Sequence, residues 1–340
     1  RHLAYDQPSY DMPLTLQPPE GVVTEIQRDA LGKPLAITRR SADGSQALTR
    51  RYVYDDYQQL CKTIEPETGA TVQDYDAAGN VLWSAAGTGL ASSADCNRSE
   101  ALATGRAVQR TYDAANRLLA LTFPDGRGNQ TWSYTPDGLP AEISTQNDAG
   151  RPLVINRYQY NHRRLLSSET LQHPDFGNLS LAYGYDGNGA LASNTYPGGR
   201  ILSYAPAALG RATSVGGYAK EASYFANGAL ARFVYGNGIV HAMSQNARGL
   251  PDRSRDATAA AAVLDDSYDY DAGGNVMAIS DGLPGAPGNR DMAYDGLDRL
   301  RSVTAPGFGN ALYEYDALDN LRRAKDGSRD RTHYFDPTNR

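Results

Sequence analysis

The sequence predicts an almost entirely β protein, in which a long antiparallel meander of repeated β-hairpins forms one continuous sheet. Three observations predict this fold class. A short phrase recurs along the chain: Tyr-Asp, two or three small residues, Gly-Asn or Asn-Arg, then an aliphatic residue. The residues between copies alternate between apolar and polar types, which is the period of a half-buried strand. Most copies lie about 20 residues apart, which suits two strands of about 5–6 residues and two turns.

The phrase itself is predicted to be the turn of each hairpin. A clear copy reads Tyr75-Asp76-Ala77-Ala78-Gly79-Asn80-Val81. Asp, Asn and Gly tolerate the left-handed backbone of tight hairpin turns, and Asp or Asn side chains can bond the backbone two residues on. The predicted repeat motif comprises Tyr54, Asp55, Tyr75, Asp76, Gly79, Tyr112, Asp113, Tyr134, Tyr160, Tyr185, Asp186, Gly189, Tyr204, Tyr224, Tyr270, Asp271, Tyr294, Asp295, Tyr315 and Asp316.

Tyrosine is unusually frequent, with 23 Tyr against 6 Phe. A tyrosine ring packs well on a pleated surface while its hydroxyl finds a polar partner. Rings at the same position of successive repeats would therefore stack in rows and hold neighbouring hairpins together. The alternative, that these rows form a platform on which a ligand stacks, is left open by the sequence.

The whole chain, residues 1–340, is predicted to be a single repeat region that is a fragment of a larger protein. The period is interrupted most strongly by an irregular insertion over residues 84–106. Shorter loops are expected near residues 145–156 and 251–266, the latter with a short helical turn over residues 257–263. The chain starts without Met and enters directly into repeat-like sequence, which favours an internal or processed piece over a signal peptide.

Charge and hydropathy exclude several classes of partner. The net charge is −6, and both signs are scattered through the turns. This leaves no basic stripe for nucleic acid and no polybasic patch for a membrane surface. No window of about 18 apolar residues is present, so no membrane span is expected.

The sequence shows no enzyme, and no catalytic, cofactor-binding or metal-binding residues are assigned. The five histidines stand far apart, without the spacing of a zinc site. The glycine-rich segments lack the pattern of a dinucleotide or phosphate loop. The acidic run over residues 265–271 suggests calcium, but it lacks the oxygen-rich loop and closing Glu of an EF-hand.

Cys61 and Cys96 are the only cysteines. A bridge between them would tie the insertion to the strand region, and closing a loop of this length contributes roughly 3–4 kcal/mol. It would also imply an oxidising compartment. The alternative is two free buried thiols.

The phrase and its spacing closely resemble the RHS/YD-repeat family, over nearly the whole chain. That family includes bacterial polymorphic toxins, insecticidal toxin-complex subunits and the teneurins. The resemblance implies hairpins wound into a curved, spiralling sheet that forms a hollow shell. In the bacterial members the shell encloses a toxic C-terminal polypeptide until delivery.

The sequence and the resemblance therefore support two functional hypotheses. The first is a structural shell segment that encapsulates or scaffolds a toxin, secreted or delivered to the cell exterior by a bacterium. Its partners would be the remainder of its own polypeptide, including a toxin domain, or a companion shell subunit. The second is an extracellular binding module that uses tyrosine rows and exposed sheet edges to recognise carbohydrate or a partner protein. A calcium-stabilised adhesin is a weaker third idea.

One part of the family pattern is absent. Bacterial shells usually finish with a paired Asp-Pro-x-Gly motif at a self-cleavage site, whereas Asp336-Pro337 is followed here by Thr338 and Asn339. No self-cleavage site is assigned. With about thirteen hairpins, the repeats predict an open arc of sheet whose edges are free to pair with another chain.

Overall fold

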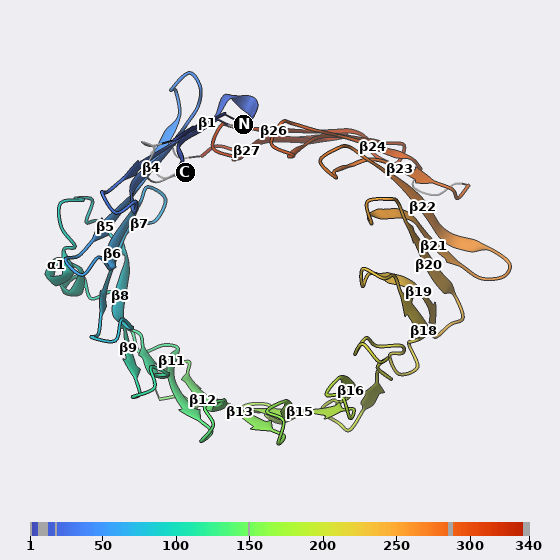
Figure 1. The fold of residues 1–340 in the computed structure, drawn as a ribbon, viewed down its shortest axis with the longest axis horizontal. Helices are drawn as coiled ribbons and strands as arrows, with labels where there is room; N and C mark the ends of the chain where they lie inside the picture. Colours follow the sequence, from blue (N-terminus) through green and yellow to red (C-terminus); the bar gives the residue numbers. More distant parts are fainter. Residues whose placement is uncertain (1, 6–12, 18, 149, 285–287, 336–340) are drawn as a thin grey trace.

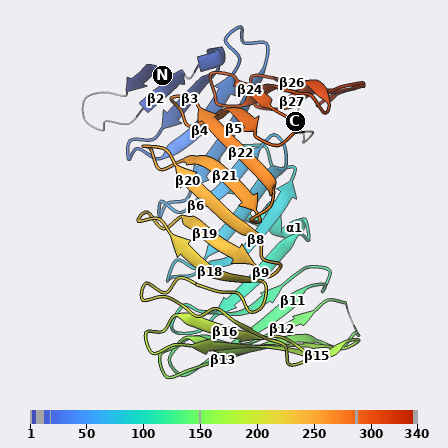
Figure 2. The same cartoon turned by 90° about the vertical axis from the view of Figure 1, so that its right-hand side faces the viewer.

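A computed structural model describes residues 2–5, 13–17, 19–148, 150–284 and 288–335. The strands follow one another round a ring, and the two ends of the chain come together at one place on it (Figure 1). Seen from the side, the strands cross the wall of this ring at a tilt (Figure 2). Asp336-Pro337 lies outside the described residues.

The first part of the ring is a 17-stranded sheet, and a 3-10 helix and one α-helix lie within the same part of the chain. Its elements are β1 (His2–Tyr5), β2 (Pro13–Gln17), η1 (Pro19–Gly21), β3 (Val23–Arg28), β4 (Pro34–Arg40), β5 (Ala47–Tyr54), β6 (Leu60–Glu65), β7 (Gly69–Tyr75), β8 (Val81–Thr88), α1 (Arg98–Ala103), β9 (Ala107–Tyr112), β10 (Leu118–Thr122), β11 (Asn129–Tyr134), β12 (Pro140–Gln146), β13 (Val154–Tyr160), β14 (Leu166–His173), β15 (Gly177–Tyr185), β16 (Leu191–Thr195) and β17 (Ile201–Ser203).

The second part is an 11-stranded sheet. Its strands are β18 (Ala219–Tyr224), β19 (Leu230–Tyr235), β20 (Val240–Gln245), β21 (Pro251–Ala257), β22 (Ala262–Tyr270), β23 (Val276–Asp281), β24 (Arg290–Tyr294), β25 (Leu300–Ala305), β26 (Gly309–Tyr315), β27 (Leu321–Asp326) and β28 (Arg329–Thr332).

Within each sheet every strand pairs antiparallel with the strand that follows it in sequence, for example β13 with β14 and β14 with β15. The predicted all-β meander is thereby confirmed. The ladder has one interruption, over residues 204–218 between β17 and β18, where single bridges join Pro206 to Ala212 and Val215 to Ala219. The strip therefore consists of two consecutive sheets rather than one.

Three local expectations are wrong. The insertion over residues 84–106 is not only loop, because β8 runs on to Thr88 and α1 lies within it. Within residues 251–266, all but the turn residues 258–261 belong to the strands β21 and β22. The expected helical turn at residues 257–263 is the turn between them, in which Thr258 Oγ1 accepts hydrogen bonds from the N–H groups of Ala260 and Ala261. The pairing of the flanking strands outweighs the helix propensity of the alanines.

The expectation of an open arc also needs correction. The carboxylate of Glu20 accepts a hydrogen bond from the N–H of Gly296, and Arg39 forms an ion pair with Asp319. The arc is therefore long enough for its ends to meet, although among the described residues no strand pairing joins them.

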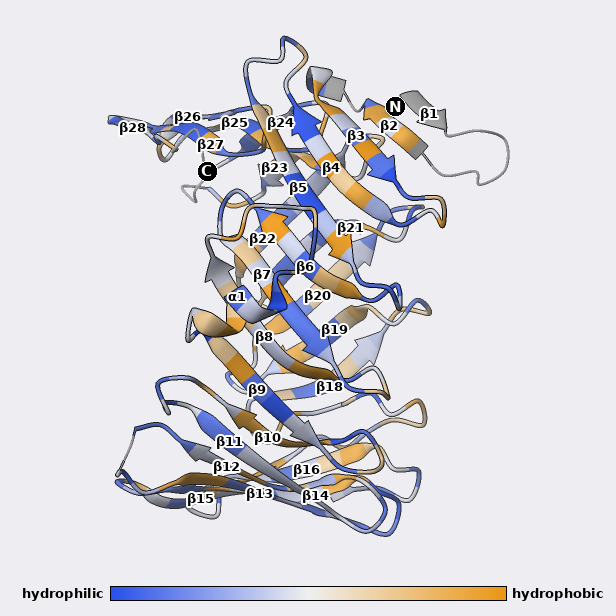
Figure 3. Cartoon of the chain, turned by 90° about the vertical axis from the view of Figure 1, so that its left-hand side faces the viewer, coloured by the Kyte–Doolittle hydropathy of each residue, from blue (hydrophilic) through white to orange (hydrophobic). Residues whose placement is uncertain are grey.

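The wall is thin, and most side chains remain accessible. The accessible surface is 19,973 Å², whereas a compact protein of this mass exposes about 13,500 Å². Apolar and polar residues alternate along β3 to β9 (Figure 3), so each strand presents two different faces. None of the described helices has the length and apolar character needed to cross a bilayer.

Candidate functional site

The recurring phrase forms the turn of each hairpin, as Asp76 illustrates. Its Oδ1 accepts hydrogen bonds from the N–H groups of Ala78 and Asn80, at 2.9 and 2.8 Å, and its Oδ2 accepts one from Asn80 Nδ2 at 2.9 Å. Gly79 has a φ of 85°, which explains why glycine suits this position. The Asn80 side chain, and then the backbone N–H groups, lower the pKa of Asp76 below its usual value.

Other copies keep this geometry with different residues. Asp113 binds the N–H groups of Ala115 and Arg117 in the same way, and its Oδ2 accepts a bond from Arg117 Nε at 2.7 Å. The corresponding bonds of Asp55, Asp186, Asp295 and Asp316 are also present. Asp271 Oδ1 accepts instead from the N–H groups of Gly274 and Asn275. The glycine position has positive φ at Gly189 and also at Gln58, Asn116, Arg164, Asp298 and Asp319.

The tyrosine of the phrase connects its hairpin to the preceding one. The hydroxyl of Tyr75 donates to the carbonyl oxygen of Leu60, the aliphatic residue that ends the previous phrase. Because this bond reaches a backbone group of the neighbouring hairpin, each tyrosine is a rung between repeats. The same bond is made by Tyr54 to Pro34, Tyr112 to Val81, Tyr134 to Leu118, Tyr160 to Pro140, Tyr185 to Leu166, Tyr224 to Ala212 and Tyr294 to Val276.

Three motif tyrosines differ from this pattern. The Tyr204 hydroxyl accepts a hydrogen bond from Asn194 Nδ2 at 3.0 Å, near the interruption between the two sheets. Burial raises the pKa of Tyr270. The ring of Tyr315 lies under the guanidinium of Arg299, 4.7 Å from its carbon. Arginines from the preceding turn lie in the same way over Tyr134 and Tyr224, a contact worth about 0.5–1 kcal/mol at exposed sites.

The insertion over residues 84–106 is fixed to the wall by a disulfide and by polar contacts. Cys61 in β6 is bonded to Cys96. The adjacent Lys62 is fully buried, and its Nζ donates to the Ser92 carbonyl oxygen and to Asn97 Oδ1, both at 2.6 Å. Burial lowers the pKa of Lys62.

Arg98, at the start of α1, continues this attachment. It forms ion pairs with Asp55 at 2.7 Å and with Asp74 at 2.9 Å. Burial works to raise the pKa of Asp55, but the bonds from Arg98 and from two backbone N–H groups outweigh it and lower the value. Sequence reasoning did not find the roles of Lys62 and Arg98, because each contact joins the irregular insertion to residues of the wall that are distant in the sequence.

The position of α1 shows which face of the wall carries the tyrosines. The helix lies outside the ring (Figure 1). Its Ala101 packs with Val72 and Trp83. Because neighbouring residues of a strand point to opposite faces, Ser84 faces the interior of the ring. Ser84 pairs with Val108, and Tyr112 lies four residues further along β9. Tyr112 therefore faces inward.

The strand registers extend this inner face through β11 to β17. Trp132 pairs with Ile143, and Ile143 pairs with Asn156. Because directly paired residues point to the same side of a sheet, all three lie on the inner face. On β13 the inner Tyr158 and Tyr160 are half-buried, whereas Arg157 and Gln159 are exposed on the outer face. This inner face is rich in aromatic and aliphatic side chains: Trp132, Tyr134, Tyr158, Tyr160, Leu171, Leu179, Leu181, Tyr183, Tyr185 and Leu202.

The acidic run at residues 265–271 is divided among separate partners. Asp265 pairs with Arg253 at 2.6 Å, and Asp266 pairs with Arg290 at 2.9 Å. Asp271 belongs to its hairpin turn. Within the part of the chain that the structure describes, no group of three or more His, Cys, Asp or Glu side chains could hold a metal ion.

Comparison with solved structures identifies chains of similar fold. The chain is similar to the TcdB2-TccC3 structure, with 16% identity over 92% of this chain and 20% of that chain and a TM-score of 0.62. It is also similar to the Tc holotoxin pore of Photorhabdus luminescens, with 17% identity over 90% of this chain and 18% of that chain and a TM-score of 0.60. A TcdB2-TccC3 structure without its hypervariable C-terminal region is 16% identical over 90% of this chain and 19% of that chain, with a TM-score of 0.60.

The chain spans about a fifth of the length of the chains that it matches. Neither a known family profile nor a curated protein matches the sequence. The likeness therefore concerns the fold, and it agrees with the repeat phrase and the rungs between hairpins. The chain has the fold of the RHS/YD-repeat proteins that its Tyr-Asp phrase predicts.

Proposed function

We propose that this chain is part of the wall of a protein shell that encloses another polypeptide. The enclosed polypeptide would be a further segment of the native polypeptide or a companion subunit, and a bacterial toxin is the occupant that the RHS/YD resemblance implies. The same resemblance favours delivery to the cell exterior. The observation that carries the proposal is a sheet bent into a ring with its aromatic face turned inward.

The amphipathic wall supports this role. On β11 the inner Trp132 and Tyr134 are half-buried, whereas the outer Thr131 and Ser133 are exposed. A soluble wall needs a polar outer face, and a wall that encloses a polypeptide can offer apolar surface on the inside. The accessible surface of 19,973 Å² leaves a large area that nothing within the described residues covers.

The neighbours in the structural comparison give further support. One is a pore form of a holotoxin, and another is a complex from which a hypervariable C-terminal region is missing. These descriptions belong to those proteins, and they make an enclosed C-terminal segment a reasonable hypothesis for this chain.

The proposed role requires no catalysis by the repeats. The phrase aspartates are occupied in turn hydrogen bonds, and most phrase tyrosines donate to backbone carbonyl groups. These residues act as structural elements in the proposal. The same occupancy weakens the alternative of a carbohydrate-binding module, because most phrase tyrosines already use their hydroxyl groups between repeats.

Photo-crosslinking in the native polypeptide that carries residues 1–340 tests the proposal. A benzophenone amino acid replaces Tyr158 on the inner face and, as the matched control, Gln159 on the outer face of the same strand. We expect position 158 to cross-link to a segment outside residues 1–340 or to a companion chain, and position 159 to give only background. Equal yields from both positions, or no cross-link from position 158, would contradict enclosure.

A further inference from the structure

The first and last hairpins of the ring meet at a seam, where side-chain contacts take the place of strand pairing. Glu20, in η1, accepts a 2.8 Å hydrogen bond from the N–H of Gly296, in the turn between β24 and β25. Arg39 in β4 lies 2.5 Å from Asp319 Oδ2, in the turn between β26 and β27. We propose that this seam is a reversible, salt-sensitive latch, at which the ring opens and closes.

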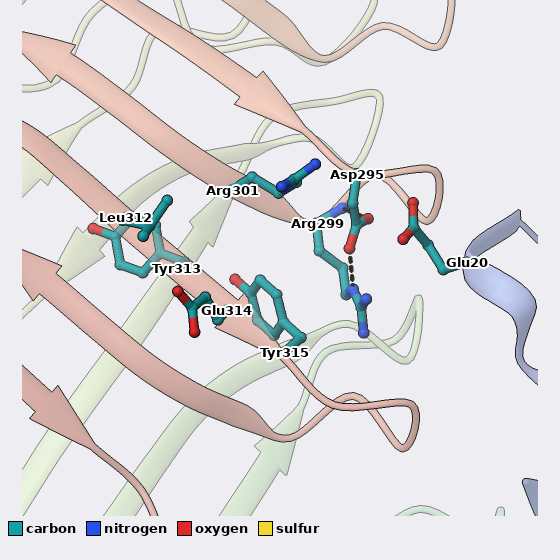
Figure 4. A pocket seen from close by; sticks show the side chains of 8 residues that line it. All are labelled: Glu20, Asp295, Arg299, Arg301, Leu312, Tyr313, Glu314 and Tyr315. Atoms are coloured by element: carbon teal, nitrogen blue, oxygen red, sulfur yellow. Dashed lines mark hydrogen bonds and ion pairs between the residues drawn. The ribbon is translucent and has the colours of Figure 1, made fainter. Parts of the chain in front are cut away.

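Asp319 is the centre of the latch because two arginines share its carboxylate. Its Oδ2 pairs with Arg39 from the first hairpins, and its Oδ1 accepts a 2.6 Å hydrogen bond from Arg299 Nη1. Arg299 Nε in turn donates to Asp295 Oδ2 at 2.6 Å, and its guanidinium covers Tyr315 (Figure 4). Positive and negative side chains therefore alternate across the seam, from Arg39 of the first hairpins to Asp319 and Arg299 of the last ones.

The contact at the seam is thin. A cleft of about 360 Å³ remains between Glu20 and the strands β25 and β26, and Arg301, Tyr313 and Glu314 line it (Figure 4). The side chains of Arg39 and Asp319 are 29% and 43% exposed. The two ends thus touch through a few side chains, most of them polar, and Leu48 and Leu318 line a second, smaller cleft at the same seam.

Elsewhere in the ring, neighbouring strands are held together by backbone hydrogen bonds. β13 and β14 are joined by a ladder of six residue pairs, and the Tyr160 rung ties the same hairpin to the one before it. Even at the interruption between the sheets, backbone bonds such as Gly216 N–H to the Ser203 carbonyl oxygen connect the two sides. The Debye length falls from about 10 Å at ~0.1 M salt to about 3 Å at ~1 M. Salt therefore weakens the seam more than the backbone ladders.

The latch rests on the ring geometry and does not depend on what the ring encloses. A closed seam would retain an enclosed segment, and an open seam would give it a lateral exit. Failure of the latch would leave the cross-linking test of enclosure unaffected, so that the two proposals fail separately.

Asp319→Asn is the most direct variant. It removes the charge that both arginines share, and asparagine suits the positive φ of 70° at this position, as Asn116 does in its own turn. The matched control is Asp298→Asn, at the same position of the β24–β25 turn, with a φ of 62°. Asp298 accepts a bond from Asn275 and, within the described residues, makes no ion pair with the first hairpins.

The distance between the ends can be measured by pulsed electron paramagnetic resonance. Spin labels are attached at Ser45→Cys and Ser328→Cys, since both native cysteines are in the disulfide. At ~0.1 M salt we expect one narrow distance distribution for the parent protein and for Asp298→Asn. We expect a shift to longer distances for Asp319→Asn, and for the parent protein at ~1 M salt.

Circular dichroism establishes that each variant keeps its β structure. A distance distribution that stays unchanged in Asp319→Asn and at high salt would overturn the proposal, because other contacts would then hold the ends. Equal opening in Asp298→Asn would also overturn it, since the effect would come from turn damage. A broad distribution in the parent protein at low salt would mean that no latch exists.

Discussion

The wall has one covered region and one bare region, although both are built from the same hairpins. The insertion covers the outer face of β6 to β8, where Val72, Trp83, Ala85 and Ala101 form a buried cluster. Between residues 107 and 203, Ser144 is the only buried residue within the part of the chain that the structure describes. The repeat alone makes a wall with little core, and the covered region acquires its core from a second layer.

This difference separates two sources of stability. In the covered region, apolar burial and the Cys61–Cys96 bridge add to the hairpin ladders. In the bare region, stability comes from the ladders, the half-buried inner face and the tyrosine rungs. Because each repeat contacts mainly its neighbours, damage in one region should remain largely local.

The two tryptophans test this comparison with the largest expected effect. Trp83 is buried beneath the insertion, whereas Trp132 is half-buried on the bare inner face. We expect Trp83→Ala to lower the free energy of unfolding by roughly 3–5 kcal/mol, and Trp132→Ala by about 1–2 kcal/mol. Denaturant unfolding of both variants measures this; equal losses would mean that the two regions are packed alike.

Loss of the disulfide should come next in size. Replacing Cys61 and Cys96 by alanine removes a cross-link between residues 35 apart, which contributes roughly 3–4 kcal/mol. Hydrogen exchange should accelerate in β6, β7 and α1 and remain unchanged in β11 to β16. Uniform acceleration of hydrogen exchange round the ring would show that the covered and bare regions are coupled, and it would contradict a local effect.

The tyrosine rung should have a smaller effect. Tyr160→Phe deletes the hydroxyl that donates to Pro140 and leaves a backbone carbonyl without this partner. We expect a loss of about 1 kcal/mol. Tyr158→Phe is the control on the same strand and face, because the Tyr158 hydroxyl makes no hydrogen bond within the described residues. If both variants lose the same stability, the rung does not join the hairpins.

Acid should weaken the turns. The Asn80 side chain lowers the pKa of Asp76, and the Arg117 N–H and side chain lower that of Asp113 against the opposing effect of burial. A carboxyl whose pKa is lower in the folded state stabilises that state fully above its unfolded pKa of about 3.9 and loses this effect as the pH falls through the folded value. Unfolding free energy should therefore fall below about pH 4 and stay level from about pH 5 to 7, as equilibrium unfolding at each pH would show. In Asp76→Asn the loss of unfolding free energy in acid should be smaller. An unchanged pH profile would mean that Asp76 does not contribute to this acid dependence.

Local features of the fold followed from sequence more readily than distant contacts. The phrase located the turns because Asp and Gly at fixed spacing satisfy a local geometry, as the φ of 85° at Gly79 shows. Strand alternation likewise predicted the two faces. The six-residue helix α1 was missed because it is short, and its N-cap residue Asn97 makes no side-chain capping bond.

Contacts between distant segments were not accessible in this way. The carbonyl partner of each rung tyrosine lies in the previous hairpin, so only the regular spacing of about 20 residues hinted at it. The meeting of Glu20 with Gly296 depends on the curvature accumulated over 276 residues. No local pattern in the sequence specifies that curvature.

Small-angle X-ray scattering of the oxidised protein at low salt tests the ring most directly. A compact globule of 340 residues has a radius of gyration of about 20 Å. The account predicts a clearly larger radius and a pair-distance distribution shifted to long distances, as a hollow ring requires. A radius of about 20 Å with a single symmetric distance peak would contradict it, because the strip would then be collapsed on itself.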